Sequence, residues 1–549
     1  MLPFTRINRN IRSLKRYRHV LGILIKYGFG HIVEQLNIDY YLELGKRIVS
    51  LGTASRDLER LSQAERLRLA LEELGPTFIK LGQLLSTRPD VVPSEYLDEL
   101  KKLQDRVPEV ETAHILSQVH LELGRPVEEL FEYFDPKPLA TASIAQVHRG
   151  TLKTGEQVVF KIRRPEIEKV IETDVDILMG LAYLVDRHLP GGEMYDPIGL
   201  VKEFRRTIYR ELDFSREGRT IDRFYANFSE NESVRIPNVF WEFSGRSVLT
   251  LEYLSGIKID EVTRLQQAGY DLKKIASTGA TVFLEQVFEH GFFHADPHPG
   301  NLHILPGNVI CIFDYGMVGR LDDDLKLQLT ELLLSVLKRD VDHIISQLLY
   351  SGELVDESNL KSLKRDLSEF IDDYYDILLQ DLQVGKLLID FIEILTEYNI
   401  KFPSNLMLLS RALIAMEGLG RQLDPSFNMV KHLRPFTEKI VKERYSPANI
   451  SKELTRTVQS YQSLSKSLPK DIKEFINRVN RNKFKIDLEH RGLERVITDL
   501  DKSSNRISFS MVIAALIIGS SLIMQTDKGP ILFGFPVLGL FGYTVAGFL

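Results

Sequence analysis

The stretch that decides the fold reads His294-Ala295-Asp296-Pro297-His298-Pro299-Gly300-Asn301, and Asp314-Tyr315-Gly316 follows it after an apolar run that ends at Phe313. A phosphoryl acceptor needs a carboxylate that orients it and accepts its proton. Nucleotide phosphates need Mg²⁺, which prefers oxygen ligands such as an amide carbonyl and a carboxylate. Asp296 suits the first role as catalytic residue, and Asn301 and Asp314 suit the second as metal ligands. These residue types therefore fit a site that binds nucleotide phosphates through Mg²⁺.

The spacing of these residues is typical of kinases. Protein kinases carry H-R-D, four residues, Asn, and then D-F-G after a strand, and Asp296 and Asn301 keep that offset of five residues. His294 and His298 allow a second interpretation, a metal site that includes Asp296. Two prolines in the run prevent a helix that would stack such ligands, and Asn301 would then have no role. We therefore expect each histidine to brace a loop or to lie in the core.

Working outward, a lysine and a loop of small residues precede this site. Val159-Phe160-Lys161 occupies a predicted strand at the place of the kinase lysine that contacts the α- and β-phosphates, and a turn at Thr154-Gly155 predicts a hairpin. The loop stands where kinases carry a glycine-rich loop, and a plain hairpin turn is its alternative. Because alanine and serine disfavour most positive-φ conformations, the loop should be stiff. It is predicted to bind the nucleotide through Leu139, Ala140, Thr141, Ala142, Ser143, Ile144, Ala145, Gln146 and Val147.

Two more segments complete the predicted nucleotide site. The run from Leu249 to Gly256 fits a kinase hinge, in which the Glu252 carbonyl and the Leu254 N–H bond the adenine edge. A carboxylate that pairs with Lys161 should come from the helix predicted within residues 203–220. Glu217 is favoured there and Glu211 is the second candidate, while an ordinary charged helix face is the alternative.

Four motifs together resemble the UbiB/AarF family of atypical kinases over roughly residues 70–320. They are Lys80-Leu81-Gly82-Gln83, the alanine-rich loop at 140–143, Glu211-Leu212-Asp213, and the segment His294–Asn301 with Asp314-Tyr315-Gly316. The resemblance implies an α+β, protein-kinase-like, two-lobed fold with an N-terminal helical extension. It also implies ATP and Mg²⁺ as cofactors and a role in ubiquinone or other isoprenoid-quinone biosynthesis. Thr141 stands where the family usually has alanine.

The resemblance also implies how the first motif contributes to the site. In the family the K-x-G-Q segment folds over the active site, so Lys80 and Gln83 are expected to approach Glu211 and Asp213. By contrast, Ala295 replaces the kinase arginine that reads activation-loop phosphorylation. Only four residues, Met317 to Arg320, separate Gly316 from a helical stretch, and no A-P-E segment follows. We therefore predict little phosphorylation of other proteins.

Charge is distributed unevenly along the 549 residues, whose net charge is −6. Residues 1–33 carry +7, residues 431–506 carry +8, residues 507–549 carry 0, and residues 34–430 carry the balance of −21. An acidic body argues against nucleic acid as a partner. The basic flanks, residues 1–33 and 431–506, indicate that the protein contacts a membrane surface with anionic lipid headgroups.

The C-terminal tail predicts membrane insertion. Residues 507–524 and 530–549 are uncharged and each is close to the ~20 residues that cross a bilayer, so we expect a transmembrane hairpin whose glycines let the helices approach. A buried helical pair is the alternative. Lys502 and Arg506 place both ends of the hairpin in the cytoplasm. The sequence thus predicts a multi-pass protein of the inner (plasma) membrane with a cytoplasmic catalytic body.

The predicted organisation has six parts. They are a basic amphipathic membrane-surface segment (1–33), a helical extension with K-x-G-Q (34–135), an N-lobe with a helical insertion (136–255), a helical C-lobe (256–430), basic juxtamembrane helices (431–506) and the transmembrane hairpin (507–549). For the first part, a helix that packs on the body is an equal alternative. Expected partners are membrane lipids, quinone precursors and proteins of quinone biosynthesis. A nucleotide-gated scaffold or lipid-extraction factor, with little phosphoryl transfer, is the alternative function.

Overall fold

The computed structural model describes residues 4–31, 61–86, 88, 92–103, 108–188, 196–338, 340–350, 357–375, 383–398, 400, 404–444, 493–525, 530–532 and 535–548. The chain divides into two compact units, Met1–Ser446 and Pro447–Leu549. The helices predicted between 34 and 60, and the basic segment at 445–492, lie outside the described residues.

The first part of unit 1 is helical, as the sequence predicts. Its helices are α1 (Phe4–Lys26), α4 (Gln63–Leu74), α5 (Pro76–Leu85), α6 (Ser94–Leu100), α7 (Thr112–Leu123) and α8 (Val127–Leu130). Gly75 separates α4 from α5 with φ of 98°, a conformation that glycine adopts without strain. Pro76 follows as the first residue of α5, the helix that carries the K-x-G-Q motif.

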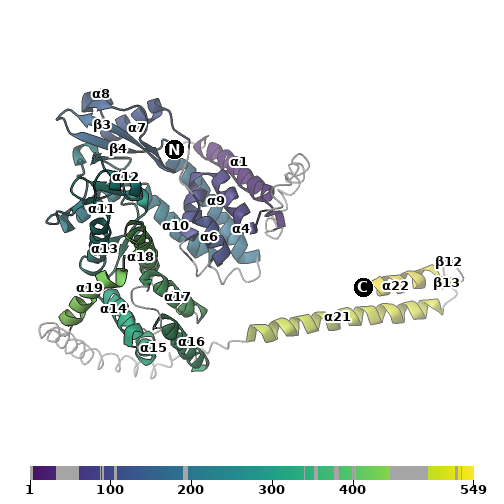
Figure 1. The fold of residues 1–549 in the computed structure, drawn as a ribbon. Helices are drawn as coiled ribbons and strands as arrows, with labels where there is room; N and C mark the ends of the chain where they lie inside the picture. Colours follow the sequence, from purple (N-terminus) through teal and green to yellow (C-terminus); the bar gives the residue numbers. More distant parts are fainter. Residues whose placement is uncertain are drawn as a thin grey trace, which may run out of the picture. The chain divides into compact units, whose positions relative to one another are not determined.

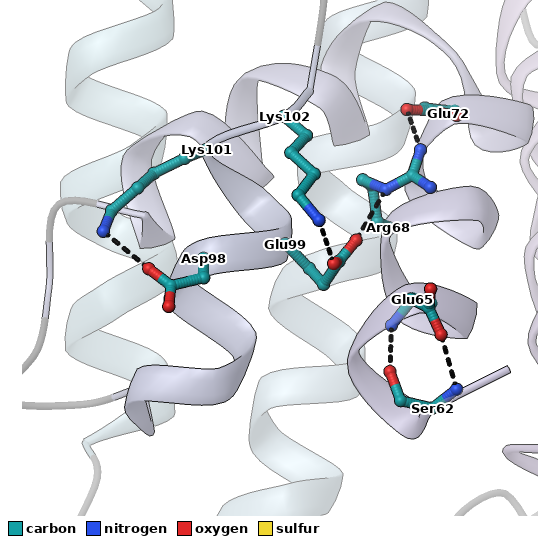
Figure 2. A network of polar contacts seen from close by, with 8 residues as sticks. All are labelled: Ser62, Glu65, Arg68, Glu72, Asp98, Glu99, Lys101 and Lys102. Atoms are coloured by element: carbon teal, nitrogen blue, oxygen red, sulfur yellow. Dashed lines mark hydrogen bonds and ion pairs between the residues drawn. The ribbon is translucent and has the colours of Figure 1, made fainter.

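Polar contacts fix α4 against α6 (Figure 2). Ser62 and Glu65 form a capping box, in which Ser62 Oγ accepts from Glu65 N (3.1 Å) and the Glu65 carboxylate accepts from Ser62 N (2.7 Å). Arg68 bridges the two helices, because it donates to Glu72 of its own helix (2.8 Å) and to Glu99 of α6 (3.1 Å). Arg68 thus joins the helix that precedes α5 to the helix that follows it.

A five-stranded antiparallel sheet follows, in the order β1-β3-β4-β6 with β2 on β3. The strands are β1 (Phe131–Phe134), β2 (Ala140–Thr141), β3 (Ala145–Leu152), β4 (Gln157–Arg163) and β6 (Val248–Glu252). The hairpin predicted at Thr154-Gly155 is confirmed, and Gly155 has φ of 96° there. Val158, Phe160 and Ile162 alternate along β4 and are fully buried, so one face of the sheet forms a core.

Between β4 and β6 the chain forms the predicted helical insertion, α9 (Ile167–His188), α10 (Pro197–Glu211) and α11 (Phe214–Asn227). After β6 the chain is mainly helical, as predicted for residues 256–430, and four strands lie within residues 292–320. The helices are α12 (Val262–Gln267), α13 (Leu272–Phe288), α14 (Asp323–Lys338), α15 (Val341–Tyr350), α16 (Glu357–Tyr375), α17 (Val384–Glu397), α18 (Ser404–Leu423) and α19 (Met429–Arg444).

Small sheets hold the segment that decides the fold. One has the order β5-β10-β9-β7 and the other pairs β11 with β8. Their strands are β5 (Val234–Arg235), β7 (Ile257–Lys258), β8 (Phe292–His294), β9 (Leu302–Leu305), β10 (Val309–Ile312) and β11 (Val318–Arg320). The β11–β8 pairing sets Val318 opposite His294, so the chain after Asp314 returns beside the start of the loop that carries Asp296.

Helix α1 packs on the body of unit 1. Val20 and Ile23 are buried in its main core. Arg16 forms an ion pair with the buried Asp174 of α9 (2.7 Å) and also donates to the Leu74 carbonyl at the end of α4 (2.7 Å). Of the two alternatives for the N-terminal segment, packing on the body is therefore observed. Contact between its exposed basic residues and a membrane stays a prediction.

Unit 2 contains α21 (Leu493–Met524) and α22 (Val537–Phe548), which lie side by side (Figure 1). They are joined through the short strands β12 (Ile531–Leu532) and β13 (Phe535–Pro536). A Cβ atom at Gly542 would stand 2.0 Å from Ser520 Oγ, and one at Gly539 would stand 3.2 Å from the Ser520 carbonyl oxygen. Both glycines therefore allow the close approach that the sequence predicts.

A hairpin of two membrane spans is not supported by the described residues. Arg506–Met524 is the one helix there that is long and apolar enough to cross a membrane. The apolar part of α22, Val537–Gly547, is only about 16 Å long, roughly half of a bilayer core. The second predicted span is interrupted because its first residues form the β12–β13 pair instead of helix.

Candidate nucleotide-binding and phosphoryl-transfer site

Lys161 and Glu217 form the centre of the site. β4 carries Lys161 and α11 carries Glu217, and the lysine Nζ lies 2.7 and 2.8 Å from the two carboxylate oxygens. Asp213 caps the start of α11 by accepting from Ser215 N (3.2 Å). Lys161 and Glu217 side chains are only 19% and 9% exposed. The prediction that Glu217 is the ion-pair partner of Lys161 is thus confirmed, and the second candidate, Glu211, is not that partner.

Asp314 completes a three-residue cluster, with its Oδ1 3.4 Å from Lys161 Nζ. Its backbone lies in the left-handed region with φ of 52°, which few residues other than glycine adopt. There Oδ1 also accepts from Gly316 N (3.2 Å), so the local turn holds the carboxylate toward the lysine. The side chain remains 56% exposed and can therefore reach a ligand.

The charges of this cluster shift each pKa. The Lys161 ammonium lowers the pKa of Asp314 to about 2, so Asp314 is ionised at neutral pH. Burial acts to lower the pKa of Lys161, but the charges of Asp314 and Glu217 outweigh it and hold that pKa above its usual value. Burial raises the pKa of Glu217, and the charge of Lys161 opposes this rise. A permanently charged lysine and an ionised, accessible carboxylate are what the binding of a metal–nucleotide complex needs.

His294 joins the two loops of the site. It is 2% exposed, its Nε2 donates to the Asp314 carbonyl (2.8 Å), and its Nδ1 accepts from Asp296 N (3.2 Å). These partners assign a neutral ring with its proton on Nε2. The predicted bracing role is confirmed, and His298 likewise accepts from Gly300 N within its own turn (3.1 Å). Among the described residues no group of three His, Cys, Asp or Glu side chains could hold a metal ion, which removes the support for a histidine metal site.

Asn301 and Asp296 are held together in the loop between β8 and β9. Asn301 Nδ2 donates to the Asp296 carbonyl (3.1 Å). The Asn301 side-chain oxygen has no hydrogen-bond partner within the part of the chain that the structure describes, so it is available to a cation. Arg411 of α18 lies within electrostatic reach of Asp296, and burial lowers the pKa of Arg411 while Asp296 opposes this effect. Sequence reasoning missed Arg411, because nothing near it in the chain marks it.

The K-x-G-Q helix reaches the site through Lys80, whose Nζ lies 3.4 Å from Glu211 Oε2. The charge of Lys80 also helps to lower the pKa of Asp314, although less than Lys161 does. The expected approach of Lys80 to Glu211 is thus confirmed. Gln83 donates to the Leu103 carbonyl (3.4 Å), and Asp213 lies 4.0 Å from Arg246 Nε. A direct role for Gln83 or Asp213 toward the nucleotide stays a prediction.

The alanine-rich loop is a tight turn between β2 and β3. Ala142 N donates to the Ala145 carbonyl (2.9 Å), and Arg164 Nε donates to the Ala142 carbonyl (3.0 Å). No residue from 139 to 147 has positive φ, which agrees with the expectation of a stiff loop. Ser143 is fully buried. Contact between this loop and a nucleotide stays a prediction.

Gln146, predicted to face the nucleotide, uses its side chain inside the N-lobe. Its Oε1 accepts from Val110 N, and its Nε2 contacts His148 Nε2 (3.3 Å). His148 Nδ1 contacts the Asp135 carbonyl (2.9 Å), and because a carbonyl only accepts, Nδ1 carries the proton. This buried relay links β3 to the chain that leaves the K-x-G-Q extension.

The side chain of Glu252 anchors the predicted hinge, a role that the sequence did not indicate. Glu252 accepts from Arg235 Nη2 (2.7 Å) and from Asn238 Nδ2 (3.0 Å), and its N–H donates to the Asn238 carbonyl (2.9 Å). Tyr253 N donates to the Gln157 carbonyl (2.9 Å). These contacts fix the end of β6, and adenine recognition by Glu252 and Leu254 stays a prediction.

Three segments of the chain match known protein families. Residues 102–348 match the family model of the ABC1 atypical kinase-like domain, residues 367–428 match the UbiB helical domain, and residues 491–549 match the ABC1/UbiB kinase-like C-terminal domain. The chain is 33% identical to a probable protein kinase UbiB of Marinobacter nauticus, with 87% of this chain and 88% of the relative covered.

Two other relatives and one solved structure are similar. A probable protein kinase UbiB of Xanthomonas campestris is 31% identical over 93% of this chain and 94% of its own length. An uncharacterized Synechocystis protein, sll1770, is 35% identical over 85% of this chain and 81% of its own length. The complex of Rv3197 from Mycobacterium tuberculosis with erythromycin aligns at TM-score 0.43 and 21% identity, covering 66% of this chain and 90% of that one.

Proposed function

Because this chain belongs to the UbiB/ABC1 family of atypical kinase-like proteins, we propose that it is a membrane-anchored ATP-dependent phosphotransferase or ATPase that supports ubiquinone biosynthesis. The observation that carries the proposal is the cluster of Lys161, Glu217 and Asp314. A lysine held by a helix carboxylate and placed 3.4 Å from an ionised aspartate is the arrangement with which kinases hold the phosphates of ATP and their metal.

The residues present fit ATP and Mg²⁺. Asn301 and Asp314 would hold Mg²⁺. Among the described residues the amide oxygen of Asn301 has no hydrogen-bond partner, and Asp314 offers an ionised, half-exposed carboxylate. When bound, the metal supplies charge neutralisation at the phosphates. Lys161 would bind the α- and β-phosphates, and the alanine-rich loop would cover them. Asp296 would orient the acceptor and accept its proton, and His294 would keep Asp296 in register with Asp314.

The acceptor is proposed to be a membrane-embedded quinone precursor or water. Arg506–Met524 would anchor the chain in the inner membrane with the catalytic unit in the cytoplasm. The short segment between Gly316 and α14 contains β11 and offers little room for a peptide-binding platform. We therefore infer that proteins are poor acceptors.

A nucleotide-gated scaffold is the second candidate, and the Lys80–Glu211 contact favours it. That contact holds the helical extension at the site, where it would restrict access for an acceptor. In this case nucleotide binding would change the position of the extension, and phosphoryl transfer would be secondary.

The test combines turnover with lipid chemistry. ATP turnover of the full chain in liposomes is measured for the natural sequence and for Asp314→Asn, and quinones and their precursors are profiled in a deletion strain that carries each form. We expect Asp314→Asn to lose turnover and the deletion strain to accumulate a quinone precursor. Unchanged turnover would remove the metal role, and an unchanged quinone profile would remove the pathway. Complementation by Asp296→Asn but not by Lys161→Ala would favour the scaffold.

A further inference from the structure

Five exposed arginines gather where α10, α11 and β11 meet. They are Arg206 and Arg210 of α10, Arg216 and Arg223 of α11, and Arg320 of β11, here called the arginine cluster. Arg206 and Arg210 are four residues apart, and Arg216 and Arg223 are seven apart, so each pair shares one helix face. Figure 1 shows α10 and α11, the two helices that carry four of the five.

Two contacts connect the members across elements. The guanidinium carbons of Arg223 and Arg320 lie 4.1 and 5.4 Å from the centre of the same ring, Phe292. Burial, followed by the positive charges of Arg206, Arg216 and Arg320, lowers the pKa of Arg210. The five side chains therefore form one concentration of positive charge.

No acidic side chain within the described residues forms an ion pair with the cluster. The carboxylates on α10 and α11 have other partners, as follows: Glu203 with Arg88 (2.5 Å), Glu211 with Lys80 (3.4 Å), Glu217 with Lys161 (2.7 Å), and Asp222 with Trp241 Nε1 (2.9 Å). Asp322, which follows β11, accepts from Leu325 N (2.9 Å). The mutual repulsion of the arginines is therefore not compensated within that part of the molecule.

A guanidinium presents a planar fork of donors that matches the oxygens of a phosphate group two at a time. Guanidinium groups on three neighbouring elements together offer more such forks than a single phosphate group can use. We propose that the arginine cluster is a binding site for a diphosphate group. Inorganic pyrophosphate and the headgroup of an isoprenyl diphosphate share this chemistry. The isoprenyl source rests on the proposed role in quinone biosynthesis, whereas the pyrophosphate source does not.

The first test measures pyrophosphate affinity by titration calorimetry on the full chain in non-ionic detergent, with EDTA present so that Asn301 and Asp314 cannot bind pyrophosphate through a metal. The variant combines Arg210→Gln with Arg320→Gln. The matched control is Arg205→Gln, since Arg205 lies on another face of α10, 5.9 Å from the centre of the Tyr209 ring. Lys161→Ala serves as the control for the nucleotide site.

We expect the double variant to bind pyrophosphate at least about tenfold more weakly, and Arg205→Gln and Lys161→Ala to bind it normally. Without ligand at low ionic strength, the double variant should have a raised Tm, because repulsion is relieved. That result also shows that it folds. Unchanged affinity in the double variant, or loss of affinity in Lys161→Ala, would overturn the proposal. Because ATP turnover takes no part in this test, its outcome is independent of the proposed enzyme activity.

A second arm distinguishes the two sources. Binding is compared between phosphatidylcholine vesicles that contain an isoprenyl diphosphate and vesicles that contain phosphatidylglycerol at equal surface charge. Preference for the isoprenyl diphosphate, lost in the double variant, identifies the lipid source. Binding of soluble pyrophosphate without such preference identifies the free anion. Equal binding to both vesicles together with no binding of pyrophosphate would show diffuse attraction to anionic surfaces and would overturn the diphosphate site.

Discussion

Trp241 packs directly on Gly218: a Cβ atom at Gly218 would stand 2.8 Å from Trp241 Cη2. Trp241 Nε1 also donates to Asp222, one turn further along α11 (2.9 Å). Gly218 follows Glu217, so the only tryptophan of the chain rests on the helix that holds the partner of Lys161. The indole therefore lies against the helix that carries Glu217, and its fluorescence should respond if that helix moves.

We expect ATP with Mg²⁺ to change the tryptophan fluorescence saturably. Nucleotide phosphates compete with Glu217 for Lys161, and the resulting shift of α11 alters the environment of the 40% exposed indole. Lys161→Met should abolish the change, and Trp241→Phe should remove the signal without removing nucleotide binding measured by calorimetry. A constant fluorescence while calorimetry detects binding would show that α11 does not respond to nucleotide.

Glu217→Gln should lower ATP turnover at least about tenfold. Among the described residues the change leaves Lys161 with Asp314 as its carboxylate neighbour, so the lysine is drawn toward the residue proposed to hold the metal. The matched control is Glu203→Gln. Glu203 lies on the neighbouring helix α10, and the substitution removes its ion pair with Arg88. Turnover and nucleotide affinity are measured for both in liposomes. Equal effects of the two substitutions would argue against a special role for Glu217.

The site could be predicted from the sequence where it depends on short spacings. Asp296, Asn301 and Asp314 follow one another within a loop, a strand and a turn, and the residue types at those spacings already indicate phosphoryl-transfer chemistry. Lys161 and Glu217 are 56 residues apart, yet each lies on a strand or helix with a recognisable pattern. The sequence therefore limits the partner of Lys161 to two candidates, Glu217 and Glu211.

Contacts that lack such a pattern could not be predicted. Arg16 forms an ion pair with Asp174, and the two residues are 158 positions apart in the chain. The local sequence around each of them is that of an ordinary helix and gives no sign of the pairing. Arg411 is brought to Asp296 only by the packing of the helical lobe. The interruption of the second apolar segment by the β12–β13 pair could not be predicted either. Apolar composition alone does not distinguish a short pair of strands from a helix.

Tyr315→Phe should leave stability unchanged or raise the free energy of unfolding by about 1 kcal/mol. Tyr315 is 2% exposed and packs on Phe224 with ring centres 4.9 Å apart. Its hydroxyl is buried and has no hydrogen-bond partner among the described residues. Removal of the oxygen therefore removes the free-energy cost of taking that hydroxyl out of water without a new hydrogen bond. Chemical denaturation of both forms in detergent provides the measurement. A loss of stability would reveal a bound water or polar partner at that hydroxyl.

Glu417→Gln should raise stability at pH 8 but not at pH 4. Glu417 lies on α18, is 5% exposed, and accepts from Val384 N at the start of α17 (3.1 Å). Burial raises the pKa of Glu417 from 4.5 to about 7, and the backbone N–H groups of Val384 and Gly385 and the charge of Arg421 oppose this rise. The folded chain therefore keeps a proton that the unfolded chain releases between pH 4.5 and 7, and the free energy of unfolding falls as pH rises through that window.

Glutamine cannot titrate and still offers a carbonyl oxygen to Val384 N. The free energy of unfolding of the variant should therefore not fall between pH 4.5 and 7. At pH 8 we expect its free energy of unfolding to exceed that of the natural chain by up to about 3 kcal/mol, with the difference absent below pH 4.5. The control is Glu438→Gln, an exposed residue that pairs with Arg434 on α19 and should show no such pH dependence. Unfolding curves of the three forms at pH 4, 6 and 8 provide the measurement. A difference that is the same at every pH would mean that Glu417 has the same pKa in the folded and unfolded chains, and the contact between α17 and α18 would then not depend on a neutral acid.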